Sequence, residues 1–194
     1  MALAGTFNNR SAGGLQHYML VAKPSLQVAE KLAQSMVDDQ AGVCVDGLCP
    51  YVTITEFLAR QEMEETIIRW MQRITSEQHS FTITLNNYSG YPGRSVFVRI
   101  QDHQPFHVLA AQLQPIDDYI QRNNCPPANF ILQPNLPLAD HLDDKLYDQL
   151  IGKYAAREFH ESFEVTELML VCTEEHGTMP VKRAVLKLQP ALAA

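Results

Sequence analysis

The clearest alternation of hydrophobic and polar residues in the chain lies between positions 50 and 57. β-Branched residues repeating with a period of two are typical of a half-buried strand. We expect the aliphatic and aromatic positions of this strand to face a core, and the hydroxyl-bearing positions to share the opposite face. The core-facing positions are Val52, Ile54 and Phe57, and the hydroxyl-bearing positions are Tyr51, Thr53 and Thr55.

Hydrophobic residues at helical spacing predict four helices, over residues 25–39, 60–78, 104–121 and 140–159. Ser25 stands where an N-cap of the first helix would stand. Pro115 lies inside the third helical pattern and is expected to end or kink that helix, because proline lacks a backbone N–H. The second helix has the strongest hydrophobic stripe, which we interpret as core: Met63, Ile67, Trp70, Met71 and Ile74.

Seven segments alternate or carry β-branched runs and are predicted to be strands, and their order with the helices favours an α+β fold. We expect two related halves, each an antiparallel-rich sheet with helices outside, in a single bilobal domain over residues 14–194. Residues 1–13 are small and polar and are expected to form a flexible arm. The predicted strands are 15–23, 50–57, 81–85, 96–100, 129–139, 163–172 and 181–188, with turns at 42–47 and 174–179.

Composition narrows the choice of partners. The 194 residues are 46% hydrophobic, which suits a globular core, and the formal net charge of −7 argues against constitutive binding of long nucleic acid. Residues 1–5 do not form a secretory leader and no apolar run is long enough to span a membrane, so we expect a cytoplasmic protein. The oligomeric state is left open. Four cysteines without a Cys-x-x-Cys pair are predicted to be free thiols: Cys44, Cys49, Cys125 and Cys172.

Two short stretches share one outline of proline, polar residue, aliphatic residue, short residue and aliphatic residue. They read PYVTI at residues 50–54 and PNLPL at residues 134–138. As a pair they resemble the two signature strands of the two-histidine (2H) phosphoesterase superfamily, which includes 2′-5′ RNA ligase-like enzymes and cyclic nucleotide phosphodiesterases. The order of predicted elements also resembles that family. The resemblance implies a bilobal α+β fold in which both signature strands line a central groove.

In the family each signature strand reads Pro-His-aliphatic-Thr/Ser-aliphatic, and the resemblance implies that one histidine acts as general base and the other as general acid. This chain departs from that pattern at three of four positions. Tyr51 and Asn135 replace the two histidines, Pro137 replaces the second hydroxyl residue, and Thr53 is retained. A tyrosine, with a reference pKa of about 10, is a poor base at neutral pH, and asparagine does not titrate. The family's acid/base mechanism therefore cannot run here unchanged.

These departures predict a catalytically degenerate protein that keeps the groove for binding. Tyrosine and asparagine remain good hydrogen-bonding partners of a ligand. We expect the groove to bind a nucleotide, another phosphorylated small molecule or a partner, and we expect no cofactor. Another interpretation is a partner-binding domain whose groove is filled by side chains such as Tyr51. The predicted ligand-binding residues are Tyr51, Thr53 and Asn135, with Arg94 or Arg99 as the nearby cation.

The alternative is an active phosphodiesterase or RNA ligase-like enzyme with rewired residues. Three histidines could substitute for the missing pair: His17 on the first strand, His141 just beyond the second signature strand, and His160 in a His-x-Ser sequence. His103 and His107 have the spacing of a helical metal pair, but Pro105 lies between them and no third ligand is evident. We therefore predict no metal site.

Overall fold

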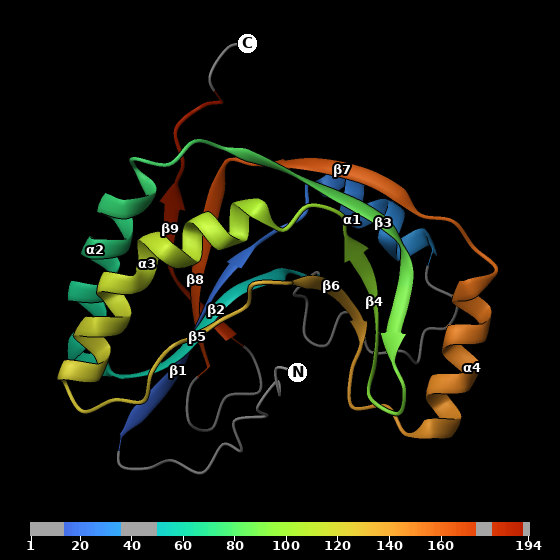
Figure 1. Cartoon of the computed structure of the whole chain (residues 1–194), viewed down its shortest axis with the longest axis horizontal. Coiled ribbons are helices and arrows are strands. Elements are labelled where there is room, and N and C mark those ends of the chain that lie inside the picture. Colours follow the sequence, from blue (N-terminus) through green and yellow to red (C-terminus); the bar gives the residue numbers. More distant parts are fainter. Residues whose placement is uncertain (1–13, 36–49, 174–179, 192–194) are drawn as a thin grey trace.

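The computed structural model describes residues 14–35, 50–173 and 180–191. Two curved sheets form an arch with the helices on its outer side (Figure 1). The elements, in order, are β1 (Leu15–Ala22), α1 (Leu26–Ser35), β2 (Val52–Arg60), a 3-10 turn (Gln61–Met63), α2 (Glu64–Thr75), β3 (Phe81–Tyr91), β4 (Ser95–Ile100), α3 (Gln104–Arg122), β5 (Asn129–Phe130), β6 (Asn135–Ala139), α4 (Asp144–Ala155), β7 (His160–Val165), β8 (Glu167–Thr173) and β9 (Pro180–Lys187).

The strands form a five-stranded sheet in the order β5-β2-β1-β8-β9 and a four-stranded sheet in the order β6-β4-β3-β7. Every pair of neighbouring strands in both sheets is antiparallel. The predicted α+β fold with two antiparallel sheets is confirmed. The predicted signature strands fall in different sheets, because β2 belongs to the five-stranded sheet and β6 to the four-stranded sheet.

Each sheet has one face covered by helices. Helices α2 and α3 pack on the five-stranded sheet, and α1 and α4 contact β7, β3 and β4 of the four-stranded sheet. A single cluster of buried hydrophobic side chains includes residues of both sheets and all four helices. We call the sheet face turned away from these helices the open face, because antiparallel sheets commonly leave one face for solvent or ligands.

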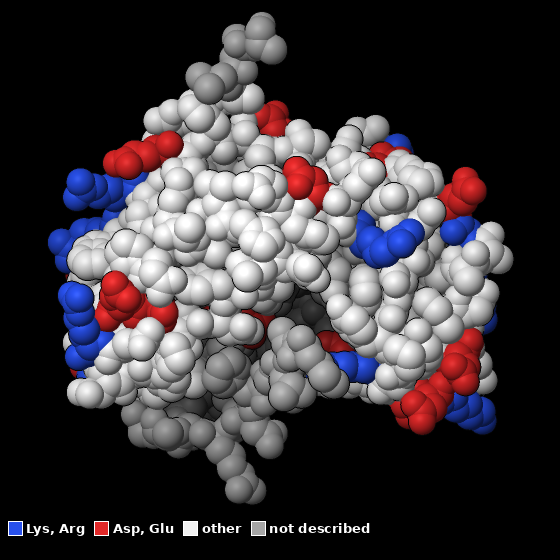
Figure 2. Space-filling model, in the orientation of Figure 1, with Lys and Arg blue, Asp and Glu red and all other residues white. Residues whose placement is uncertain are grey.

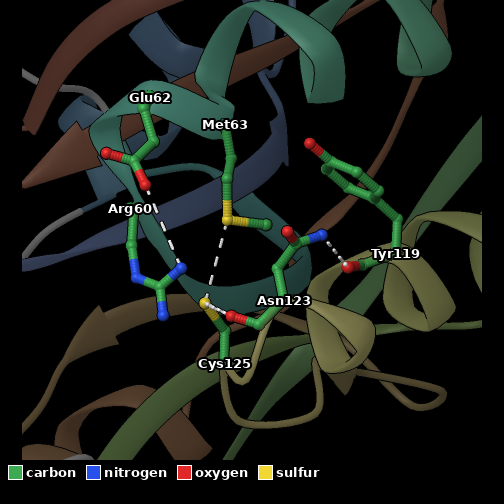
Figure 3. Close-up of polar contacts among 6 residues, drawn as sticks. All are labelled: Arg60, Glu62, Met63, Tyr119, Asn123 and Cys125. Carbon is green, nitrogen blue, oxygen red and sulfur yellow. Dashed lines mark hydrogen bonds and ion pairs between the residues drawn. The ribbon is translucent and has the colours of Figure 1, made fainter.

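Helices α2 and α3 run antiparallel to each other. At one end, the Cys125 thiol, just after α3, lies 3.8 Å from the Met63 sulfur at the start of α2 (Figure 3). At the other end, the rings of Phe81 and Phe106 meet edge to face. Trp70 of α2 was predicted to lie in the core, but it is 42% exposed and packs against Tyr119 of α3. The hydrophobic stripe of this helix therefore extends beyond the face that is buried in the core.

Two predicted strands are each divided between the sheets. Residues 163–172 were expected to form one strand, but the chain leaves the four-stranded sheet after Val165 and enters the five-stranded sheet at Glu167. Residues 129–139 likewise separate into β5 and β6, in different sheets. Continuous hydrophobic alternation cannot reveal such a crossover, because both halves of the run keep the same period.

Two of the helices are shorter than predicted, and a third is uninterrupted. The second begins with a 3-10 turn and ends at Thr75, and the fourth runs only from Asp144 to Ala155. The Asp143 side chain caps the first turn of the fourth helix by accepting a hydrogen bond from the Leu146 N–H. Helix α3 continues through Pro115 to Arg122. Pro115 therefore does not end the helix, and burial of residues on both sides of it supplies the compensating packing: Leu113, Ile116 and Ile120.

Ser25 does cap α1, since its hydroxyl accepts from the Val28 N–H at 3.4 Å. Several predictions lie outside the described residues: the arm at 1–13, the end of the first helix, the turns at 42–47 and 174–179, and Cys44 and Cys49. None of the described helices combines the length and the hydropathy that a membrane span requires.

Candidate functional site

Strands β2 and β6 bring the two signature stretches to the centre of the molecule, where they contact each other although they belong to different sheets. The space-filling view shows a hollow between the two halves, with acidic and basic side chains at its edge (Figure 2). The candidate site has two walls: the open face of the five-stranded sheet and the open face of the four-stranded sheet.

The wall of the five-stranded sheet is apolar beside Tyr51. Val21 of β1 and Val171 of β8 are buried together with Met19, in a cluster separate from the main core. Tyr51 and Met169 pack against this cluster. Because neighbouring residues of a strand point to opposite faces, Met19 and Val21 lie on the open face while Tyr18 and Leu20 lie in the main core.

Tyr51, which occupies the first signature position, has an environment that keeps it neutral. Its hydroxyl lies 4.0 Å from the Met19 sulfur, a weak acceptor. Burial raises the pKa of the Tyr51 hydroxyl above its usual value, and the negative charge of Glu56 raises it further. A phenol whose pKa is raised from about 10 carries its proton at neutral pH. Tyr51 can donate a hydrogen bond here, but it cannot act as a general base.

The hydroxyls expected on one face of β2 are separated by a β-bulge. Thr53 pairs with Val21, but Thr55 pairs with Leu20, so one residue of β2 is left over between them. Thr53 is half-buried on the side of Tyr51. Thr55 is buried and its hydroxyl donates to the Asn129 carbonyl of β5 at 3.0 Å. The prediction that Thr55 shares a face with Tyr51 and Thr53 is therefore wrong, because the bulge shifts the register.

His17 lies on the open face of the five-stranded sheet, two residues before Met19. Its Nε2 atom is 3.9 Å from a carboxylate oxygen of Glu56, and both side chains are about one quarter exposed, at 26% and 25%. That buried nitrogen has no hydrogen-bond partner among the described residues. An imidazole beside a carboxylate is a combination that can accept and donate a proton. This pair is the site's one arrangement with acid/base character in the described part of the five-stranded sheet.

The wall of the four-stranded sheet is polar at the second signature position. Asn135 opens β6 and lies directly opposite Arg99 of β4. Their sequence neighbours Leu136, Val98 and Ile100 are buried in the main core, so Asn135 and Arg99 point to the open face together. The Arg99 Nε atom donates to the Asn86 carbonyl of β3 at 3.2 Å, which holds the guanidinium across the sheet.

The remaining candidate residues are spread more widely. Arg94 is at the turn before β4, at the opposite end of that strand from Arg99, and its carbonyl accepts from the Leu142 N–H. His141 is exposed just after β6, with a left-handed φ of 56°. His160 lies on β7, the edge strand of the four-stranded sheet on the side away from β6. Pro137 pairs with Phe97 of β4, so an apolar contact continues the open face beyond Asn135.

Sequence reasoning did not single out Glu56 or Asn86. Glu56 belongs to the predicted first signature strand, but the bulge that puts it on the same face as Tyr51 has no sequence signal. The predicted strand 81–85 stops just before Asn86, whereas β3 continues through Asn86, which forms a pair with His160. No group of three or more histidine, cysteine, aspartate or glutamate residues suited to a metal occurs within the described ranges.

The architecture is that of the 2H phosphoesterases: the chain has a 2H phosphoesterase-like fold. Solved structures of Escherichia coli LigT in complex with 3′-AMP and with NADP⁺ match it with TM-scores of 0.66 and 0.65, both at 18% sequence identity, covering 90% of this chain and 98% of LigT. The structure of TT0787 from Thermus thermophilus matches with a TM-score of 0.62 at 15% identity, covering 90% of this chain and 98% of that one. No family model and no curated protein matches the sequence.

Proposed function

We propose that the protein binds a nucleotide or another phosphorylated small molecule without hydrolysing it, and that Asn135 and Arg99 hold the phosphoryl group. The observation that carries this proposal is the cross-strand pairing of Asn135 with Arg99 on the open face of the four-stranded sheet. An amide and a guanidinium then stand side by side at the second signature position, where the resemblance places a catalytic histidine.

The chemistry of the two side chains suits a phosphoryl group. A guanidinium presents several N–H donors in a rigid fork that matches phosphate oxygens, and hydrogen bonds to charged groups are stronger than neutral ones. The amide nitrogen of Asn135 adds further donors. Because Arg99 already donates to the Asn86 carbonyl, part of its side-chain freedom is restricted before a ligand arrives, which lowers the entropic cost of binding.

Tyr51 and Thr53 contribute the facing wall in this proposal. The neutral Tyr51 hydroxyl and the Thr53 hydroxyl donate hydrogen bonds to the ligand, and neither removes a proton from it. With asparagine at position 135, the second signature strand provides no titratable group either. The two signature positions therefore provide ligand-binding groups without the acid/base pair of the family's mechanism.

The structural relatives support the ligand class. LigT of Escherichia coli has been solved in complex with 3′-AMP, ATP and phosphate, so this fold accommodates phosphorylated ligands in that protein. A shared fold does not transfer an activity between proteins of such low identity. The ligand class is therefore proposed for this chain from the Asn135–Arg99 pair, and the relatives guide the choice of probe.

Isothermal titration of the full chain with 5′-AMP at low ionic strength tests this function. We expect saturable binding that weakens about tenfold or more in Arg99→Ala, since one hydrogen bond to a charged group is lost. Arg99→Lys should recover only part of the affinity, because lysine keeps the charge but not the fork. Arg73→Ala, at an exposed arginine of α2, is the matched control and should bind as the native chain does.

Turnover is measured on the same samples with 2′,3′-cyclic AMP. We expect no product above the rate of the buffer. Cyclic phosphodiester cleavage that disappears in Tyr51→Phe would overturn the proposal of a non-hydrolytic binder, and so would the absence of any AMP binding by the folded native chain.

A second candidate function, an active phosphodiesterase with rewired residues, is favoured by the His17–Glu56 contact alone. In that case His17 is the proton-transfer group and Glu56 orients its ring. Cleavage of 2′,3′-cyclic AMP that is lost in His17→Ala but kept in His107→Ala, at an exposed histidine of α3, would establish this function. His141 and His160 lie away from the Tyr51 wall, which makes them weaker substitutes.

A further inference from the structure

Four polar side chains, one from each strand, form a row across the open face of the four-stranded sheet. Asn135 of β6 pairs with Arg99 of β4, the Arg99 guanidinium donates to the Asn86 carbonyl of β3, and Asn86 pairs with His160 of β7. The row thus begins at the proposed phosphoryl site and ends at the outer edge of the sheet.

The side chains of the row share one face. On β7, the residues that alternate with His160 are buried in the main core, as Phe163 and Val165 show. On β3, Leu85 is likewise buried, so Asn86 points away from the core. Arg99 and His160 are exposed, and Asn86 and Asn135 are half-buried. A ligand can therefore reach every member of the row.

The backbone is irregular at the centre of the row. Between Leu85 and Tyr88 the pairing of β3 with β4 shifts by one residue, so that Asn86 and Asn87 together face Arg99. Asn87 has a φ of 57°, in the left-handed region that non-glycine residues rarely adopt. Its N–H donates to the Phe159 carbonyl, and its side chain accepts from the Phe159 N–H. Bulges and left-handed residues held in this way occur frequently at binding sites.

We propose that this row is an extended binding strip that recognises a nucleoside carrying a second phosphoryl group, such as a nucleoside 3′,5′-bisphosphate. The inference rests on the proposed function, because the first phosphoryl group occupies the Asn135–Arg99 position. The second phosphoryl group lies at His160, and the Asn86 amide contacts the sugar between them.

The dimensions of the sheet agree with such a ligand. Neighbouring strands lie about 4.8 Å apart, so β4 and β7 are separated by about 10 Å across the sheet. The Arg99 side chain reaches toward β3, where its Nε atom donates to the Asn86 carbonyl, and this brings the span to β7 closer to the size of a nucleoside. The groups are also chemically suited, since an imidazole N–H and an amide both donate to phosphate or sugar oxygens.

Binding of adenosine 3′,5′-bisphosphate is compared by isothermal titration with binding of 5′-AMP and 3′-AMP to the full chain. We expect the bisphosphate to bind about tenfold more tightly than either monophosphate, the gain of one hydrogen bond to a charged group. His160→Ala should reduce this advantage to within about twofold while the affinity for 5′-AMP stays unchanged. His107→Ala on α3 is the matched control and should keep the full advantage.

The outcomes separate this inference from the proposed function. Equal affinity for bisphosphate and monophosphates in the native chain overturns the extended strip and leaves the Asn135–Arg99 site standing. An equal loss of both ligands in His160→Ala also overturns it, because His160 would then act on the first phosphoryl position or on the fold. If no nucleotide binds at all, both proposals fail.

Discussion

The two walls of the candidate site differ in kind although each belongs to an antiparallel sheet with helices packed on its other face. On the five-stranded sheet, the residues beside Tyr51 are hydrophobic and buried, with Val21 and Val171 at 0% and 1% exposure. On the four-stranded sheet, Asn135 and Arg99 are accessible and polar. Tyr51, at the first signature position, packs against hydrophobic side chains, whereas Asn135 at the second and its neighbour Arg99 present hydrogen-bond donors.

In the proposed function, this difference separates ligand binding from catalysis. The acid/base mechanism that the family resemblance implies needs a titratable group on each wall, and neither a neutral tyrosine at position 51 nor an asparagine at position 135 can serve as one. Anion binding needs only well-placed donors, and one wall can provide them. Three sets of variants test the contrast between the walls.

Restoring histidine on both walls should create cyclic phosphodiesterase activity. The variant combines Tyr51→His, Asn135→His and Pro137→Thr, and Thr53 already supplies the remaining hydroxyl. We expect turnover of 2′,3′-cyclic AMP to rise about a hundredfold or more above the native rate, since each proton-transfer group contributes about that factor. Initial rates of product formation are the measurement.

The single-wall variants are the controls for that experiment. Tyr51→His alone and Asn135→His with Pro137→Thr should both stay near the native rate. Full activity with histidine at position 135 alone would contradict the difference between the walls. The five-stranded wall would then already hold a working proton-transfer group, and His17 would be the first candidate to test.

A valine-to-threonine substitution in the five-stranded wall should lower stability more than a threonine-to-valine substitution in the four-stranded wall. Val171→Thr places a hydroxyl in the buried apolar cluster, which costs about 1–3 kcal/mol of unfolding free energy when the group lacks a partner. Thr84→Val, on the open face of β3, should change it by about 0.5 kcal/mol or less, as is usual for accessible positions. Urea denaturation of both variants measures the difference. Equal costs would mean that the two walls are packed alike.

Tyr51→Phe should make the unfolding free energy less sensitive to alkaline pH. We expect this effect to be smaller than those of the preceding variants. The folded pKa of Tyr51 is raised, so below the unfolded value of about 10 the hydroxyl is neutral in both states and pH has no influence through it. Above about pH 10 the unfolded tyrosine ionises first, which favours unfolding. Buried Tyr18, whose pKa is also raised by burial and by Glu64, contributes in the same direction and remains in the variant.

Unfolding free energies between about pH 9 and pH 11 therefore give the measurement. The native chain should lose stability over this range, and Tyr51→Phe should lose less. Tyr91→Phe, at a tyrosine that is 54% exposed, is the control and should follow the native curve. If Tyr51→Phe also follows the native curve, Tyr51 is not held in the apolar environment described above.

Periodicity identified most elements of the fold because each sheet has one helix-covered face. The alternation in β2 correctly placed Val52, Ile54 and Phe57 in the core. It could not show that residues 163–172 change sheets at Thr166, since a crossover depends on contacts far away in the chain. For the same reason local pattern could not reveal that α3 tolerates Pro115, where the packing of the whole helix outweighs one missing hydrogen bond.

The candidate site was predictable to a similar extent. The motif outline singled out Tyr51, Thr53 and Asn135 as candidates, and the structure brings β2, which follows Tyr51, into contact with β6. Sequence alone could not show which arginine lies beside Asn135, because this depends on strand register. In the pairing of β4 with β6, Arg99 and not Arg94 lies opposite Asn135. The role of Glu56 and the row through Asn86 both depend on β-bulges, which insert a residue without a sequence signal strong enough to detect.

The most direct test of the contrast between the walls is a titration of uniformly ¹⁵N-labelled protein with 5′-AMP, followed by amide chemical shifts. The account predicts that the largest shift changes occur in β4 and β6, around Arg99 and Asn135, and that amides of Met19, Val21 and Val171 change little. Largest changes on the five-stranded sheet, with β4 and β6 unaffected, would contradict the account and place the ligand at Tyr51 and His17.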